Sequence, residues 1–281
     1  MNNNLFVQWA DQTPQIRKNI LQMIAKAQSG HPGGSLSCVE IIYTLMAPNG
    51  VMKYNPKKPL ERERDRFVLS KGHACPTLYA VLSAVGHDIS QDELMSLRQL
   101  GSRLQGHPDR ARLPYVEAST GSLGQGASIA QGIAMSYKLD SLNHRVFALL
   151  GDGEMQEGQI WEVALSAPHQ KLDNLTLILD YNKGQIDGPT NKVLSLDPLT
   201  DKWRSFGWEV SEVNGHSYSE LYTALSKKSP RPQMVIAHTI KGRGVSFMEG
   251  NTDWHGRAPN VKELELALQE VAANRQIGLS N

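Results

Sequence analysis

The chain has 281 residues, enough for one large α/β domain or two small ones, and its 40% hydrophobic and 20% charged content is ordinary for a globular protein. A formal net charge of +1 gives no reason to expect nucleic acid or an anionic membrane as the partner. The N-terminus lacks the apolar core of a signal peptide, and no run approaches the roughly 18 apolar residues of a membrane helix. Two cysteines, Cys38 and Cys75, suggest no disulfide framework, so we expect a cytoplasmic protein.

The first third of the chain predicts helices separated by one short strand. Residues 14–28 carry apolar side chains at helical spacing and end at 29–35, "SGHPGGS", where glycines and a proline stop the helix. Residues 37–47, "SCVEIIYTLMA", are predicted as the next helix. Residues 65–86, "DRFVLSKGHACPTLYAVLSAVG", indicate a short strand, a turn at 71–73 and a helix.

The centre and the last third predict strands that alternate with helices. Strands are expected at "RVFALL", "NLTLILDYN", "WEVSEV" and "QMVIAHTI", and helices within 120–139, 158–170, 218–227 and 261–273. Continuous apolar strands joined by helices indicate an α/β fold with a mainly parallel β-sheet and helices on both faces. Because strands resume after 183–202, that stretch is interpreted as a long functional loop. We expect a single domain over 1–281, with 1–13 and 274–281 as tails.

Histidines follow glycines more often than chance would place them. Five of the nine are preceded directly by a glycine, and these are His31, His73, His87, His107 and His216. Because glycine is poor inside helices and strands, such histidines are expected in loops. Solvent-exposed turns explain any one of them, but they are a weak explanation for the whole set.

Polar residues follow two of the predicted strands. "RVFALL" runs into Gly151-Asp152-Gly153, and "NLTLILDY" runs into Asn182. A single crossover helix joins the two strands, so their carboxyl ends are expected to be neighbours or near-neighbours. Asp152 and Asn182 would then offer oxygen ligands to a hard cation such as Mg²⁺ or Ca²⁺, and the glycines would let a diphosphate approach the backbone. An ordinary turn with a capping aspartate is the alternative, but the spacing of about thirty residues to Asn182 favours a metal–diphosphate site.

That spacing is the signature of thiamine-diphosphate enzymes, and further motifs narrow the resemblance. In chain order they are "SGHPGGSLS", "LSKGHACPTLYA", "GHPD", "TGSLGQG", "GDGEMQEG", "DYNKGQIDG", "TIKGRG" and "DWHG". From about residue 14 to about 258 the chain resembles the N-terminal, diphosphate-binding domain of transketolases. The resemblance implies the thiamine-diphosphate-binding (PP-type) fold, and transfer of a two-carbon ketol unit from a ketose phosphate to an aldose phosphate.

The resemblance also implies a role for each matching position. The implied metal ligands, for Mg²⁺ or else Ca²⁺ or Mn²⁺, are Asp152, Asn182 and the carbonyl of Gly184. The implied contacts to thiamine diphosphate are His73, Gly121, Leu123, Asp152, Gly153, Glu157, Asn182, Ile186, Lys241 and His255. The implied catalytic histidines are His31, His73, His107 and His255. Of these, His31 and His107 resemble active-site histidines that bind sugar hydroxyls and assist proton transfer. Glu157 and Glu162 match acids that connect paired active sites across a subunit interface.

In complete transketolases a second domain supplies the glutamate that activates the cofactor and much of the grip on the sugar phosphate. No acid in this sequence occupies the place of that glutamate, so the chain is expected to be a fragment or, preferably, one subunit of a split enzyme. The expected partner is a C-terminal subunit with pyrimidine-binding and C-terminal domains, in an α2β2 assembly. The alternatives are a specialised sugar-phosphate transketolase, an enzyme similar to dihydroxyacetone synthase or deoxyxylulose-phosphate synthase, and a non-catalytic scaffold protein.

Overall fold

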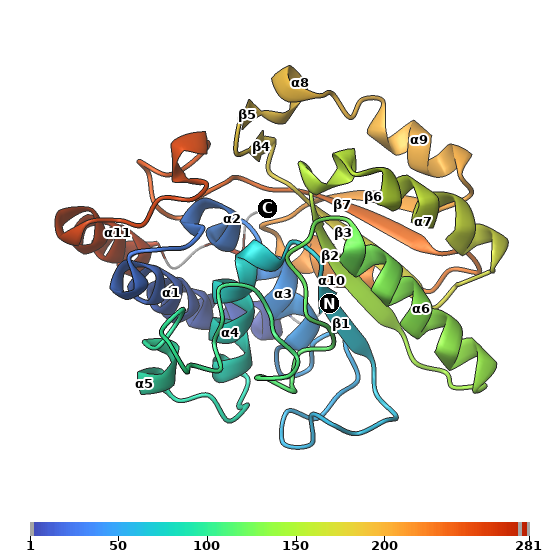
Figure 1. Cartoon of the computed structure of the whole chain (residues 1–281), viewed down its shortest axis with the longest axis horizontal. Coiled ribbons are helices and arrows are strands. Elements are labelled where there is room, and N and C mark those ends of the chain that lie inside the picture. The colour runs from blue at the N-terminus through green and yellow to red at the C-terminus, as the bar shows by residue number, and fades with distance from the viewer. Residues whose placement is uncertain (1–2, 275–276, 280–281) are drawn as a thin grey trace.

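The computed structural model describes residues 3–274 and 277–279, and its centre is a parallel sheet of five strands in the order β1-β2-β3-β7-β6 (Figure 1). The strands are β1 (Arg66–Leu69), β2 (Val146–Gly151), β3 (Leu175–Tyr181), β6 (Glu209–Asn214) and β7 (Gln233–His238). Strand β2 pairs directly with β3, and Gly151 lies opposite Asp180. The predicted parallel sheet, and the predicted neighbourhood of these two strand ends, are therefore confirmed.

Helices cover both faces of the sheet, as the continuous apolar strands predicted (Figure 1). One layer contains α1 (Asn3–Ala27), α3 (Val39–Met46), α4 (Cys75–Ala84) and α10 (Tyr218–Ser226), with α11 (Val261–Ala273) packed against α1. The other layer contains α6 (Gln125–Leu139), α7 (Gly158–His169) and α9 (Leu199–Ser205). Alternate residues of β2 serve the two cores: Phe147 and Leu149 pack with the first layer, and Ala148 and Leu150 with the second.

Short elements complete the chain between these layers. They are the helices α2 (Pro32–Leu36), α5 (Gln91–Leu94) and α8 (Thr190–Val193), the 3₁₀ turns η1 (Gly72–Ala74), η2 (Glu154–Gln156) and η3 (Thr252–Trp254), and the two-stranded ribbon of β4 (Gly184–Gln185) and β5 (Gly188–Pro189). The loop expected at 183–202 thus holds β4, β5 and α8 and ends inside α9. No helix among the described residues is both long enough and apolar enough to cross a membrane.

The structure corrects the expected ends of the fold. Helix α1 begins at Asn3 and runs through Pro14, so residues 3–13 are part of the fold rather than a tail. Burial of Phe6 and Trp9 in the core outweighs the one helical hydrogen bond that proline cannot donate. At the other end Ile277 is buried, and the amide of Tyr218 donates to the carbonyl of Gly278 at 3.0 Å. Residues 1–2, 275–276 and 280–281 of the expected tails lie outside the described part.

The stretch after α1 holds a short helix that the sequence did not predict. Helix α1 ends at Ala27, before the glycines and the proline of 29–35 as expected, and Pro32–Leu36 then forms α2. Proline is favourable at the first position of a helix, because its missing N–H would have no partner there. Pro32 therefore starts α2, and His31 lies directly before it in the short link from α1.

Candidate active site

A pocket of about 350 Å³ opens at the carboxyl ends of β1, β2, β3 and β7. It is lined by His31, Lys71, His73, His107, Gly121, Leu123, Gly151, Asp152, Gly153, Glu154, Gln156, Glu157, Asn182, Gly184, Gln185, Ile186, Lys241 and His255. The structure thus brings together the residues expected at the site, with the single exception of Glu162. This is the edge at which open parallel sheets bind their ligands.

Oxygen atoms from three positions gather at the ends of β2 and β3. Asp152 is 2% exposed, and its carboxylate accepts hydrogen bonds from the amide of Gly153 at 2.9 Å and from the hydroxyl of Thr190 at 3.1 Å. Burial, together with the negative charge of Asp180, raises the pKa of Asp152 to about 6. Because burial disfavours the ionised form of Asp152, a cation bound nearby would stabilise that form.

The other two expected metal ligands also fit a hard cation. The side-chain oxygen of Asn182 accepts from the amide of Gly184 at 3.1 Å, and the carbonyl of Gly184 accepts from the ammonium of Lys241 at 3.2 Å. A cationic group thus already contacts one of the expected ligand oxygens. The expected set thus combines carboxylate, amide and carbonyl oxygens, which are ligand types that a hard cation prefers. Among the described residues no cluster of three or more His, Cys, Asp or Glu could hold a metal.

The sequence analysis did not predict a buried ion pair that lies next to Asn182. Lys71 and Asp180 are almost fully buried, and the Lys71 ammonium donates to the Asp180 carboxylate at 2.5 Å. Asp180 also accepts from Ser37 at 2.5 Å and from the amide of Asn182 at 3.2 Å, and Thr239 donates to its second oxygen. By accepting from the Asn182 amide nitrogen, this network fixes the side chain whose oxygen meets the amide of Gly184.

Two signals in the sequence point to that pair. Asp180 is a charge inside a continuous apolar strand, where a buried carboxylate needs a partner. Lys71 lies two residues after the end of β1, within "LSKGHA", so it reaches the same edge of the sheet.

Glu154 is a second residue that sequence reasoning missed. Its buried carboxylate accepts hydrogen bonds from the hydroxyl of Ser70 at 2.5 Å and from the amides of Gly124 at 2.9 Å and Gly151 at 3.1 Å. One side chain therefore ties the ends of β1 and β2 to the glycine-rich turn that precedes α6. The run of acids in "GDGEMQEG" was the available signal.

Four histidine rings lie together at the mouth of the pocket. Ring centroids are 5.2 Å apart for His31 and His73, 5.4 Å for His73 and His255, 5.5 Å for His31 and His255, and 6.5 Å for His31 and His107. Burial lowers the pKa of His31 to about 4 and that of His255 to about 3, holds the pKa of His73 well below its usual range, and lowers the pKa of His107. The cluster is therefore neutral at physiological pH.

Lys241 fixes the orientation of one of these rings. Burial and the positive charge of Lys71 lower the pKa of Lys241 to about 8, and its side-chain nitrogen lies 3.1 Å from Nδ1 of His255. When the ammonium donates to Nδ1, the proton of neutral His255 is on Nε2.

Gly121 is the place where the glycine-rich turn meets the histidine cluster. Its φ of +136° is one that other residues rarely adopt, and a Cβ there would lie 2.8 Å from the His107 ring. Glycine is therefore required for the turn to pass so close to His107.

Three expected residues lie at or beyond the rim. The side chain of Ile186 is 71% exposed, and Glu157 is exposed where it lines the pocket. Glu162 is exposed on α7 and does not line the pocket. Their expected contacts, to cofactor and to a neighbouring subunit, stay predictions.

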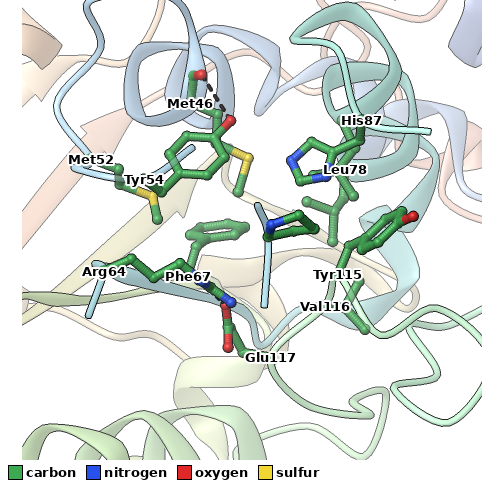
Figure 2. Close-up of a pocket in the computed structure, with 12 residues that line it drawn as sticks. Met46, Met52, Tyr54, Arg64, Phe67, Leu78, His87, Tyr115, Val116 and Glu117 are labelled. Atoms are coloured by element: carbon green, nitrogen blue, oxygen red, sulfur yellow. Dashed lines mark hydrogen bonds and ion pairs between the residues drawn. The ribbon is translucent and has the colours of Figure 1, made fainter. Parts of the chain in front are cut away.

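The two remaining glycine-preceded histidines are buried elsewhere, so exposed turns do not explain them. Nδ1 of His216 lies 2.8 Å from the Glu40 carboxylate, and its Nε2 accepts from the amide of Ile240 at 2.8 Å. Glu40 is paired with buried Arg17 at 2.7 Å. This network anchors the segment that carries Lys241. Figure 2 shows His87 in a separate, smaller cavity beside Tyr54, Tyr115 and Leu78.

Comparison with known proteins identifies the family. The model of the transketolase, thiamine diphosphate binding domain matches residues 10–276. The chain is 40% identical over 93% of its length to an apulose-4-phosphate transketolase subunit of Phocaeicola vulgatus, of which it covers 92%. It is 43% identical over 91% of its length to 6-deoxy-6-sulfo-D-fructose transketolase subunit SqwG of Clostridium sp., of which it covers 93%.

Single-chain transketolases match over the same region. Human transketolase is 39% identical over 95% of this chain, which spans only 42% of the human protein. The crystal structure of the Campylobacter jejuni transketolase superposes with a TM-score of 0.89 at 35% identity, covering 97% of this chain and 44% of that one.

Proposed function

Because the chain belongs to the family of transketolase thiamine-diphosphate-binding domains, we propose that it is the N-terminal subunit of a two-chain transketolase. In that role it moves a two-carbon ketol unit from a ketose phosphate to an aldose phosphate. The observation that carries the proposal is the pocket, where oxygen ligands, a diphosphate-sized space and four neutral histidines meet at one edge of the sheet. A cytoplasmic location and the single-domain boundaries stay predictions.

Asp152, Asn182 and the carbonyl of Gly184 would hold a divalent metal, for which Mg²⁺ is the expected ion. Gly153 and His73 would contact the diphosphate at the start of η2, and Lys241 and His255 would add donors from the opposite wall. Gly121, Leu123 and Ile186 would line the thiamine end of the pocket. Thiamine diphosphate, when bound, supplies the electron sink that lets a bond beside a ketose carbonyl break.

The histidines supply what the cofactor lacks, which is proton transfer at sugar oxygens. His31, His107 and His255 are neutral, so each can accept a hydrogen bond or a proton from a substrate hydroxyl. His73 is the most enclosed ring of the four and is suited to orient rather than to titrate. Together they would bind and deprotonate hydroxyls in a pocket from which water is partly excluded.

The acids of the pocket support the need for a partner. Three carboxylates line it: Asp152, which faces the expected metal, Glu154, which accepts three hydrogen bonds, and Glu157, which is exposed at the rim. Asp152 and Glu154 are therefore already engaged within the site, and the carboxyl that activates the cofactor is proposed to come from the partner. The relatives that are named as transketolase subunits support the same interpretation, and an α2β2 assembly is the expected form.

The substrate is proposed only as a class. Relatives that match this chain over nearly their whole length are named for apulose 4-phosphate and for 6-deoxy-6-sulfo-D-fructose, whereas single-chain relatives are named transketolase without a sugar. We infer that the donor is a ketose that carries a phosphate or a sulfonate, because both relatives named for a sugar combine a ketose with an anionic group.

The test is an assay of ketol transfer with thiamine diphosphate and Mg²⁺. This chain is assayed alone and with a C-terminal transketolase subunit from the same genome, on xylulose 5-phosphate, apulose 4-phosphate or 6-deoxy-6-sulfofructose as donor and an aldose phosphate as acceptor. Turnover in the mixture on at least one donor, with none in either chain alone, supports the proposal. Turnover in this chain alone contradicts the need for a partner. Failure of the mixture to bind the cofactor favours a non-catalytic binding protein.

A further inference from the structure

Arg98 lies behind the histidine cluster, in the turn between α5 and the loop that carries His107. Its guanidinium donates to the hydroxyl of Ser29 at 3.1 Å and to the carbonyl of Gly106 at 3.2 Å. Ser29 lies two residues before His31, and Gly106 lies directly before His107. A single side chain therefore joins the two loops that present these histidines.

The backbone at Arg98 and at Gly106 has special features that fit this contact. Arg98 has a φ of +62°, in the left-handed region that non-glycine residues rarely occupy, and such strain persists where surrounding contacts over-determine it. A Cβ at Gly106 would lie 2.7 Å from the guanidinium carbon, so only glycine lets the plane of the guanidinium pack against this backbone. The glycine before His107 thus has a specific reason.

Arg98 lacks the carboxylate partner that a nearby arginine of the same loop has. Arg103, in the same loop, forms two hydrogen bonds to the carboxylate of Glu93, at 2.7 and 2.8 Å. Among the described residues no carboxylate lies within ion-pair distance of Arg98, and its Nε is buried without a hydrogen-bond partner. The positive charge of Arg98 is therefore felt by the rings beside it.

We propose that Arg98 is a positioning residue for the active site: it bridges the loops of His31 and His107 and places a positive charge beside both imidazoles. The proposal rests on the proposed function, because it concerns the same histidines. Burial is the main cause that lowers the pKa of His31 and of His107, and Arg98 is the charge that adds most to it in both cases.

Other charged and titratable groups also face His31. They are Lys71 from the end of β1, His73 from η1, Lys241 from the segment after β7 and His255 from the end of η3. The lysines lower the pKa of His31 as Arg98 does, so removing Arg98 should raise this pKa without restoring the value of an exposed histidine. Arg98 is distinct because its charge also lowers the pKa of His107, second to burial.

The first test needs no turnover. In the isolated chain labelled at its histidine rings, NMR titration follows His31 and His107, assigned by His→Gln variants. Arg98→Met should make both rings titrate at a higher pH, and Arg103→Met, the matched control in the same loop, should leave them unchanged. The proposal is overturned by unchanged titration in Arg98→Met, or by an equal shift in Arg103→Met, which would reveal a general loosening of the loop.

The second test uses the complex with the C-terminal subunit. Arg98→Met should lower kcat/KM about tenfold near neutral pH and move the acid limb of its pH profile upward. Arg98→Lys keeps the charge but loses the two-point bridge, so kcat/KM should fall while the acid limb stays. This variant carries the test if Arg98→Met does not fold, and wild-type kcat/KM in Arg98→Lys would overturn the bridge. An inactive wild-type complex would count against the proposed function alone, since the titration of Arg98→Met in the isolated chain is independent of it.

Discussion

Two cavities of this molecule contain a histidine that follows a glycine, and they differ in almost everything else. The active-site pocket holds about 350 Å³ and gathers histidines, lysines and carboxylates from four strand ends. The second cavity holds about 20 Å³ and surrounds His87 with Tyr54, Tyr115, Met46, Met52 and Phe67, above the ion pair of Arg64 and Glu117 (Figure 2). The same dipeptide thus leads to a reactive site in one place and to core packing in the other.

The difference lies in what each imidazole meets. His87 is 7% exposed, its ring stacks on Tyr54 at 5.9 Å, and neither ring nitrogen has a hydrogen-bond partner among the described residues. His31 also has a buried Nδ1 without such a partner, but it faces three further histidines and a pocket that can hold a ligand. Burial alone therefore does not mark a catalytic histidine. Access to a ligand-sized space does.

The buried ion pairs beneath the two cavities should differ most in their effect on stability. Lys71→Met leaves Asp180 as a buried carboxylate without a paired cation and should cost about 3–5 kcal/mol of unfolding free energy. Arg64→Met leaves Glu117 with Arg66 at 3.1 Å and Arg110 at 3.8 Å, and should cost clearly less. Urea denaturation of both variants measures the difference, and equal losses would contradict the role given to Lys71.

Cofactor binding should depend on the first cavity alone. Asp152→Asn is isosteric but removes the charge that faces the expected metal, so affinity for thiamine diphosphate with Mg²⁺ should fall about 100-fold or more. Calorimetric titration of the complex measures it. His87→Phe is the matched control and should bind like wild type. Undiminished binding by Asp152→Asn would remove this residue from the metal site.

Turnover should separate the two histidines. In the complex, His31→Ala should lower kcat/KM about 100-fold, because an imidazole that handles substrate protons contributes roughly 10²–10⁴ in rate. His87→Phe should leave kcat/KM within about twofold, since its ring touches only core residues. If both variants were equally active, the histidine cluster would have no part in catalysis.

The loss of folding stability at acid pH should depend on His87 in the second cavity. Burial and the charge of Arg64 lower the pKa of His87 from 6.5 to about 4, so its neutral form stabilises the fold fully above pH 6.5 and this contribution is lost as the pH falls toward 4. Between about pH 7.5 and about pH 5, His87→Phe should therefore lose roughly 2 kcal/mol less stability than wild type. Denaturation at the two pH values gives the comparison, and an unchanged pH dependence would show that His87 does not titrate in this way.

Much of the fold could be predicted because its signals are local. The apolar runs at β2 and β3 and the single helix between them predicted that Asp152 and Asn182 would meet. The helix predicted at 261–273 is α11, and its start is fixed locally by a capping box of Asn260 and Glu263. The start of α1 was predicted wrongly, because Pro14 looks like a first helical residue when the aromatic core contacts of Phe6 and Trp9 are not known.

What could not be predicted depends on contacts between distant residues. Lys71 and Asp180 are 109 positions apart, so the local sequence shows that a carboxylate inside an apolar strand needs a partner but does not identify Lys71 as that partner. Arg98 reaches Ser29 across 69 positions, and the sequence around His87 does not reveal that its neighbours are two tyrosines from separate loops. The resemblance supplied the roles of the site residues, but only the fold shows which charges hold them in place.

The central claim is that this chain forms half of a catalytic site, and a continuous-variation experiment tests it most directly. The total concentration of this chain and the C-terminal subunit is kept constant with saturating thiamine diphosphate and Mg²⁺, and ketol transfer is measured as their ratio changes. The account predicts no activity at either end and a maximum at equal amounts of the two chains. Activity that rises steadily with the fraction of this chain, and persists in its pure form, would contradict it.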